Sequence, residues 1–160
     1  MPNLNHIHNS PYSHDEARIF VRHSDGSSLV VPEQANDIDQ LSFRMQIPFG
    51  LSIDKRLTAI NEVIKDDEEN GLGFIALQRF LGGAESAVSN GSGVHDFAYG
   101  YLGQIHIGKS AGEGTGRQIM PITEARDIIN NSPLIDSIDR KLAFQAFRTA
   151  EISSYLDLAS

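Results

Sequence analysis

The chain has 160 residues, of which 40% are hydrophobic and 21% charged, and this composition is typical of one folded globular domain. Thirteen Lys and Arg residues against 21 Asp and Glu residues give a net charge of −8, which disfavours sequence-independent binding to DNA or to anionic lipid. The absence of cysteine excludes a disulfide framework, a thiolate zinc site and a cysteine nucleophile.

The N-terminal segment, residues 1–14, is rich in Asn, His, Ser and Pro and is predicted to be a flexible arm, with residues 15–160 forming a single globular domain. Residues 1–9 lack the basic start and apolar core of a signal peptide, and no apolar run is long enough for a membrane-spanning segment. We therefore expect synthesis in the cytoplasm without a signal peptide, and any delivery outside the cell by a specialised secretion system.

A β-hairpin is predicted first in the chain. Residues 19–22 have strand character, residues 24–27 (Ser-Asp-Gly-Ser) supply turn chemistry, and the apolar run resumes over residues 29–31. A helix over residues 15–22 is the alternative. Residues 33–50 have mixed signals and are assigned to neither class.

Helical periodicity is strong from Ser52, a plausible N-cap, onwards. One apolar stripe follows it and consists of Ile53, Leu57, Ile60, Val63 and Ile64. A second helix is predicted from Phe74, Leu77, Phe80 and Leu81, ending at Gly82-Gly83. Two further helices are expected, one from about Thr123 and one from about Asp136 to Leu156. The predicted fold is mainly α: a single compact helical domain with a small N-terminal β-hairpin.

Glycine is unevenly distributed, because ten of the 14 glycines lie between residues 82 and 116. This density predicts a long polar loop from Gly91 to Gly116. Long loops inside compact domains are usually functional, so we place the candidate site there.

The predicted loop contains residues suited to acid–base hydrolysis. His95 or His106 would be the general base, because an imidazole titrates near neutral pH, and Asp96 would fix its tautomer. Tyr99 would donate to the substrate, and Glu113 would supply a second carboxylate. These five residues are the predicted catalytic set.

Two cations near this set, Lys109 and Arg117, are predicted to hold an anionic group of the substrate. No cofactor and no metal site are predicted. The pair His6 and His8 is assigned to the flexible arm rather than to metal binding.

Two other interpretations of the same stretch are considered. A His-Asp pair at the start of a helix with a Tyr three residues later is similar to phospholipase A2, but the glycine-rich calcium loop pattern of that family is missing. The run from Gly103 to Ser110 matches the spacing of a phosphate-binding P-loop. We interpret it as a chance match, because neither a long apolar strand before it nor a continuous helix after it is expected.

The segments Phe74 to Arg117 and Pro133 to Ile152 resemble the bacterial polymorphic-toxin type 44 domain family. The resemblance is carried by Gly82-Gly83, Asp96-Phe97, Tyr99-Gly100, Gly103 and Gln118, and by Pro133 with Asp136 and Asp139. The Trp-Asp pair of the family is replaced by Ala84-Glu85-Ser86 here.

The resemblance implies a bacterial toxin or secreted effector domain with hydrolase activity, usually supposed to be a nuclease, and a cognate immunity protein as partner. The acidic charge makes a cell-wall polymer or a lipid a possible substrate beside an anionic polymer such as RNA. From another class, the same charge suits a non-enzymatic acidic binding protein: an immunity protein, an inhibitor or an adaptor.

Overall fold

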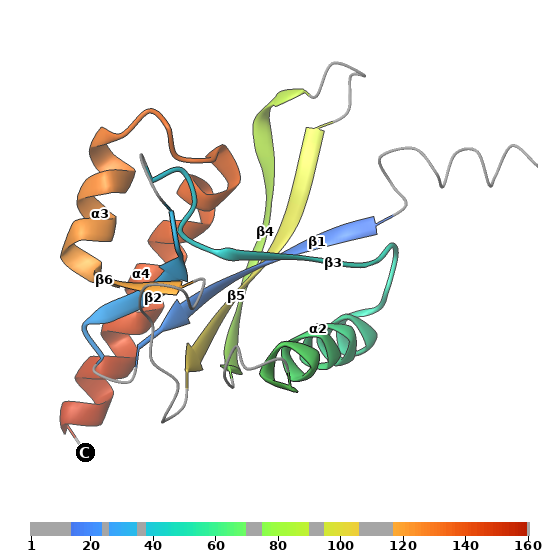
Figure 1. Cartoon of the computed structure of the whole chain (residues 1–160), viewed down its shortest axis with the longest axis horizontal. Coiled ribbons are helices and arrows are strands. Elements are labelled where there is room, and N and C mark those ends of the chain that lie inside the picture. The colour runs from blue at the N-terminus through green and yellow to red at the C-terminus, as the bar shows by residue number, and fades with distance from the viewer. Residues whose placement is uncertain are drawn as a thin grey trace, which may run out of the picture.

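The computed structural model shows a mixed α/β fold built on a six-stranded sheet, so the predicted mainly α, all-helical class is wrong (Figure 1). The structure describes residues 14–23, 26–34, 38–69, 75–89, 95–105 and 117–159. In chain order the elements are β1 (His14–Arg22), β2 (Ser28–Pro32), β3 (Phe43–Pro48), α2 (Ile53–Glu69), β4 (Ile75–Ser89), β5 (His95–Ile105), β6 (Arg117–Pro121), α3 (Ile122–Asn131) and α4 (Ser137–Ala159).

The predicted hairpin is confirmed, since β1 and β2 pair antiparallel with Val21 opposite Val30. Strand β1 is also the centre of the sheet, because it pairs antiparallel with β3 and parallel with β5. The strand order is β4-β5-β1-β2-β6, with β3 beside β1. A strand covered on both faces needs apolar residues at successive positions, which explains the run Ile19-Phe20-Val21.

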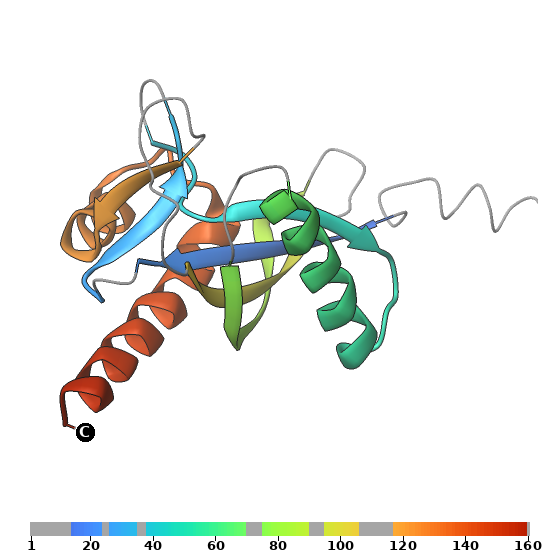
Figure 2. The same ribbon diagram turned by 60° about the horizontal axis from the view of Figure 1, so that its bottom comes forward.

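Helices cover both faces of the sheet, with α2 on one side and α3 and α4 on the other (Figures 1 and 2). Successive residues of a strand point to opposite faces, so the sheet separates two apolar cores. The core under α2 contains Ala17, Ile19, Val21, Ile60, Ile64 and Tyr101. The core under α3 and α4 contains Phe20, Ala98, Leu102, Ile129, Leu142 and Phe147.

The helix predicted to end at Gly82-Gly83 is wrong, because residues 75–83 lie inside the fifteen-residue strand β4, while Phe74 lies outside the described residues. The pairing of β4 with β5 is irregular between Leu77 and Arg79 and again between Phe80 and Gly82. At the first irregularity Gln78 is an extra residue, so Leu77 and Phe80 face α2 although they are three positions apart. The β-bulge thus produces an apolar spacing that is typical of a helix.

The predicted loop from Gly91 to Gly116 is also wrong over residues 95–105, which form β5. A Cβ atom added at Gly100 would lie 2.8 Å from the side-chain carbons Cδ1 and Cδ2 of Leu142, so the glycine allows α4 to approach the sheet closely. Residues 91–94 and 106–116 lie outside the described residues.

The three predicted helices outside the glycine region are confirmed as α2, α3 and α4. Ser52 caps α2, since its Oγ accepts a hydrogen bond from the backbone N–H of Lys55 at 3.4 Å. Within the described residues, no helix combines the length and the apolar character needed to cross a membrane.

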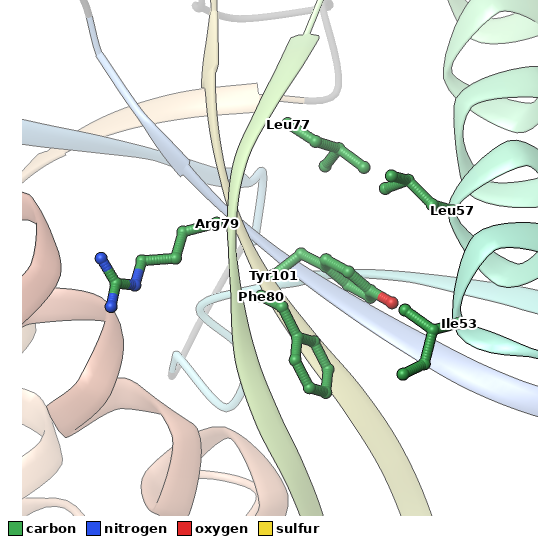
Figure 3. A pocket seen from close by; sticks show the side chains of 6 residues that line it. All are labelled: Ile53, Leu57, Leu77, Arg79, Phe80 and Tyr101. Atoms are coloured by element: carbon green, nitrogen blue, oxygen red, sulfur yellow. The ribbon is translucent and has the colours of Figure 1, made fainter.

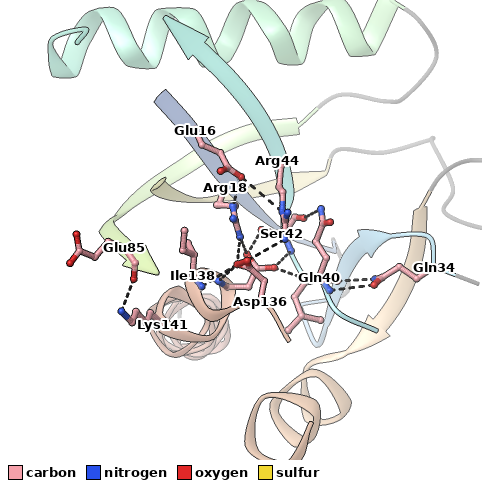
Figure 4. A network of polar contacts seen from close by, with 12 residues as sticks. Glu16, Arg18, Gln34, Gln40, Ser42, Arg44, Glu85, Asp136, Ile138 and Lys141 are labelled. Atoms are coloured by element: carbon pink, nitrogen blue, oxygen red, sulfur yellow. Dashed lines mark hydrogen bonds and ion pairs between the residues drawn. The ribbon is translucent and has the colours of Figure 1, made fainter. Parts of the chain in front are cut away.

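A buried ionic network fixes the start of α4 against the sheet (Figure 4). The Arg18 side chain, 3% exposed, donates hydrogen bonds to Glu16 at 2.6 Å, to Asp136 at 2.9 Å and to Asp139 at 2.8 Å. Asp139 is fully buried and also accepts from the backbone N–H of Leu41 at 2.8 Å. The network joins β1 to α4 and to the segment before β3 with its charges paired.

The network shifts the titration of two of its members. Burial alone would raise the pKa of Asp136, but its hydrogen bond and ion pair with Arg18, helped by Arg44, hold that pKa below its usual value. Burial alone would lower the pKa of Arg18, but Asp136, Asp139 and Glu16 raise it above its usual value. Both pKa shifts mean that the folded protein stabilises the charged forms of Asp136 and Arg18.

Candidate functional site

The structure describes four of the predicted catalytic and binding residues, and the other three lie outside the described residues. His95 and Asp96 are the first two residues of β5, so they lie on a strand and not at the start of a helix. His106, Lys109 and Glu113 lie outside the described residues. Tyr99 lies in β5, half-buried, and Arg117 begins β6.

The structure does not bring Tyr99 and Arg117 together. Strands β1 and β2 lie between β5 and β6 in the sheet. Arg117 is buried and pairs in the backbone with Pro32 of β2. The structure therefore separates Arg117 from the described members of the predicted catalytic set, His95, Asp96 and Tyr99, which all lie in β5. The hydrolase interpretation and the toxin resemblance stay predictions.

Tyr99 instead contacts an arginine that the sequence did not single out. The guanidinium carbon Cζ of Arg56, in α2, lies 3.6 Å from the centre of the Tyr99 ring and 5.9 Å from that of Phe80. The Phe97 ring meets the Tyr99 ring edge-on, with 5.0 Å between the ring centres. We call Arg56, Phe80, Phe97 and Tyr99 the aromatic–arginine cluster.

The buried stripe of α2 explains how Arg56 reaches the sheet. Residues 56, 60 and 64 face the sheet at a spacing of four, and Arg56, at 7% exposed, occupies the first of these buried positions. Ile53 and Leu57, which the sequence assigns to the apolar stripe, are 72% and 40% exposed. Apart from Tyr99, which belongs to the predicted catalytic set, the signal in the sequence that points to this site is a charged residue four positions before Ile60.

Beside the cluster lies an apolar groove of about 180 Å³ between the N-terminal half of α2 and the strands β4 and β5 (Figure 3). It is lined by Ile53, Leu57, Leu77, Arg79, Phe80 and Tyr101. The Arg79 guanidinium extends away from the other lining side chains (Figure 3), as expected from its pairing with Leu102, which belongs to the core under α3 and α4. The side chains that face the groove are thus apolar or aromatic.

Gly83 leaves room for the Phe97 ring of the aromatic–arginine cluster. A Cβ atom at this position would lie 2.4 Å from the terminal carbon of the Phe97 ring, so the ring occupies the space that a side chain would need. Packing of an aromatic ring over a glycine on the neighbouring strand is a known way to stabilise sheet edges. Phe97 itself stays 43% exposed.

The charge of Arg56 is only partly compensated. The Tyr99 ring covers one face of the guanidinium, a cation–π contact that stabilises a charge. Yet the Nε atom is buried and has no hydrogen-bond partner in the part of the chain that the structure describes. A buried donor without an acceptor costs about 1–3 kcal/mol of stability. An apolar side chain at position 56 would fill the same space without that cost.

The described residues contain no group of three or more His, Asp or Glu side chains placed to hold a metal ion. Comparison of the sequence with models of protein families and with curated proteins finds no match. The site has therefore to be interpreted from its own geometry.

Proposed function

We propose that this chain is a non-enzymatic binding protein whose receptor surface is the face formed by α2, β4 and β5. The observation that carries the proposal is the apolar groove bounded by Ile53 and Leu57, two large aliphatic residues that α2 leaves exposed beside it. The ligand is an apolar side chain of a partner protein.

Three features support this function. The groove volume of about 180 Å³ suits one side chain rather than a polymer. Phe80, Phe97 and Tyr99 form an aromatic cluster beside it, and exposed aromatic residues are enriched at binding surfaces. Exposed apolar residues gathered on one face mark interaction sites more often than singly scattered ones.

The test is selection of binding peptides from a random library against the wild-type protein. We expect enriched peptides that share an apolar residue. The variant Leu57→Asp should weaken the selected peptide by about tenfold or more, because a carboxylate at the groove wall must be desolvated when the ligand binds.

Phe144→Asp is the matched control, because Phe144 is also a large exposed residue but lies on α4, at the other side of the sheet. It should leave peptide binding unchanged. Thermal unfolding of both variants shows whether each is folded. The proposed function is overturned if no peptide is enriched, or if Leu57→Asp weakens binding of the enriched peptides no more than Phe144→Asp does.

A further inference from the structure

The groove and the aromatic–arginine cluster share one residue, and this makes them parts of one site. Phe80 lines the groove, and its ring centre lies 5.9 Å from the Arg56 guanidinium carbon. The ring is 48% exposed, so a ligand that enters beside Phe80 passes next to a buried cation. The site therefore offers an apolar pocket and a positive charge within the span of one amino acid.

The geometry of Arg56 favours a carboxylate. Its guanidinium lies with one face on Tyr99, which leaves the N–H groups at its edge for hydrogen bonding. Its Nε atom is buried and out of reach of a ligand, so the terminal nitrogens Nη1 and Nη2 are the donors that remain. A planar carboxylate matches the fork formed by these two nitrogens and brings the opposite charge to them.

Resting on the proposed function, we infer that the ligand is the carboxyl-terminal residue of a partner chain, with an apolar side chain. Such a residue carries its carboxylate and its side chain on the same Cα atom, which fits the short separation between Arg56 and the groove at Phe80. The side chain enters the groove, and the terminal carboxylate accepts hydrogen bonds from Arg56. An internal apolar residue supplies no carboxylate to Arg56.

The probes that test this assignment are N-acetyl-L-phenylalanine and N-acetyl-L-phenylalaninamide, which differ only in the charge of the terminal group. Titration of the wild-type protein, followed by NMR of its backbone amides, should show both probes at residues around Leu57 and Phe80. The free acid should bind about 10- to 100-fold more tightly, as expected for hydrogen bonds between charged groups.

The variant Arg56→Met removes the guanidinium and keeps a long apolar side chain. In this variant the acid and the amide should bind equally. N-acetyl-L-aspartyl-L-phenylalaninamide, which places a carboxylate before the aromatic residue instead of at its end, should bind the wild-type protein no better than the simple amide.

The inference is overturned if the acid and the amide bind the wild-type protein equally, or if neither binds. It is also overturned if the aspartyl probe matches the free acid, because the carboxylate would then not be terminal. The wild-type comparison needs no variant, so the stability of Arg56→Met does not decide the outcome. The proposed function can still hold when this inference fails. It holds if the library yields peptides that bind through an internal apolar residue and that Leu57→Asp weakens.

Discussion

Two buried arginines lie on opposite faces of the same sheet and differ in how their charges are satisfied. Arg18 is 3% exposed and donates hydrogen bonds to three carboxylates, among them Asp136 and Asp139. Arg56 is 7% exposed and stacks on Tyr99, and its Nε has no acceptor in the described residues. Arg18 is buried with its charge paired, as expected for a residue that stabilises the fold. Arg56 pairs with no carboxylate among the described residues, so its charge is left for a ligand to balance.

The same substitution at the two arginines separates these roles. Arg18→Met should lower the free energy of unfolding by about 3–5 kcal/mol, because the fully buried Asp139 would lose its cation. Urea denaturation measures the loss. A loss below about 1 kcal/mol would show that the network contributes little to the fold, and the contrast with Arg56 would fail.

Gly100→Ala tests the packing that brings α4 and its acidic start onto the sheet. The added methyl group would lie 2.8 Å from the Cδ carbons of Leu142, so we expect a loss of about 1–3 kcal/mol in the free energy of unfolding. The double variant Gly100→Ala/Leu142→Ala should lose less than the sum of the two single variants. Simple additivity would show that the two positions do not touch.

Acidification should weaken the ionic network around Arg18. Since the pKa of Asp136 is lower in the folded protein than its unfolded value of about 4, its contribution to stability is fully present above that value. The contribution is lost as the pH falls from about 4 through the folded pKa. Unfolding curves of the wild type and of Asp136→Asn should therefore converge in acid, and a constant difference between them would contradict the account.

Arg56→Met should have the smallest effect on stability, within about 1 kcal/mol of the wild type. Loss of the cation–π contact with Tyr99, worth about 0.5–2 kcal/mol, is offset by removal of the unpaired Nε donor. Thermal unfolding compares the two proteins. A loss as large as that of Arg18→Met would mean that Arg56 is mainly structural.

The elements that depend on local pattern were predictable from the sequence. The hairpin of β1 and β2 follows from alternation and turn residues, and α2 from its apolar period and the Ser52 cap. Strand β4 was missed because Gln78 and Leu81 are extra residues at bulges. The extra Gln78 places Leu77 and Phe80 on one face at a spacing that a regular strand does not allow.

Strand β5 was missed for a different reason, because glycines in β4 and β5 are explained only by side chains from other parts of the chain. Gly100 accommodates Leu142 of α4, and Gly83 on β4 accommodates the ring of Phe97 on β5. In the sequence both read as loop or turn residues. Both glycines are needed for contacts between elements, which a local sequence pattern does not reveal.

The site was only partly predictable. Tyr99 was singled out, but its role as a donor to a substrate was derived without its partner, since Arg56 comes from another element. Whether His95, Asp96 and His106 form a hydrolytic centre stays a prediction. Expression of the wild type and of His95→Ala in a bacterium tests it. A toxic wild type and a harmless variant that folds equally well would favour the catalytic role of His95.

The central claim, that Arg56 takes part in ligand binding and Arg18 does not, is tested most directly by the side-chain Nε–H signals of the two arginines in a ¹H–¹⁵N NMR spectrum. Titration with N-acetyl-L-phenylalanine should shift the Arg56 signal to saturation and leave the Arg18 signal in place. The amide of the same probe should leave both nearly unmoved. A stationary Arg56 signal, or equal shifts with acid and amide, would contradict the account.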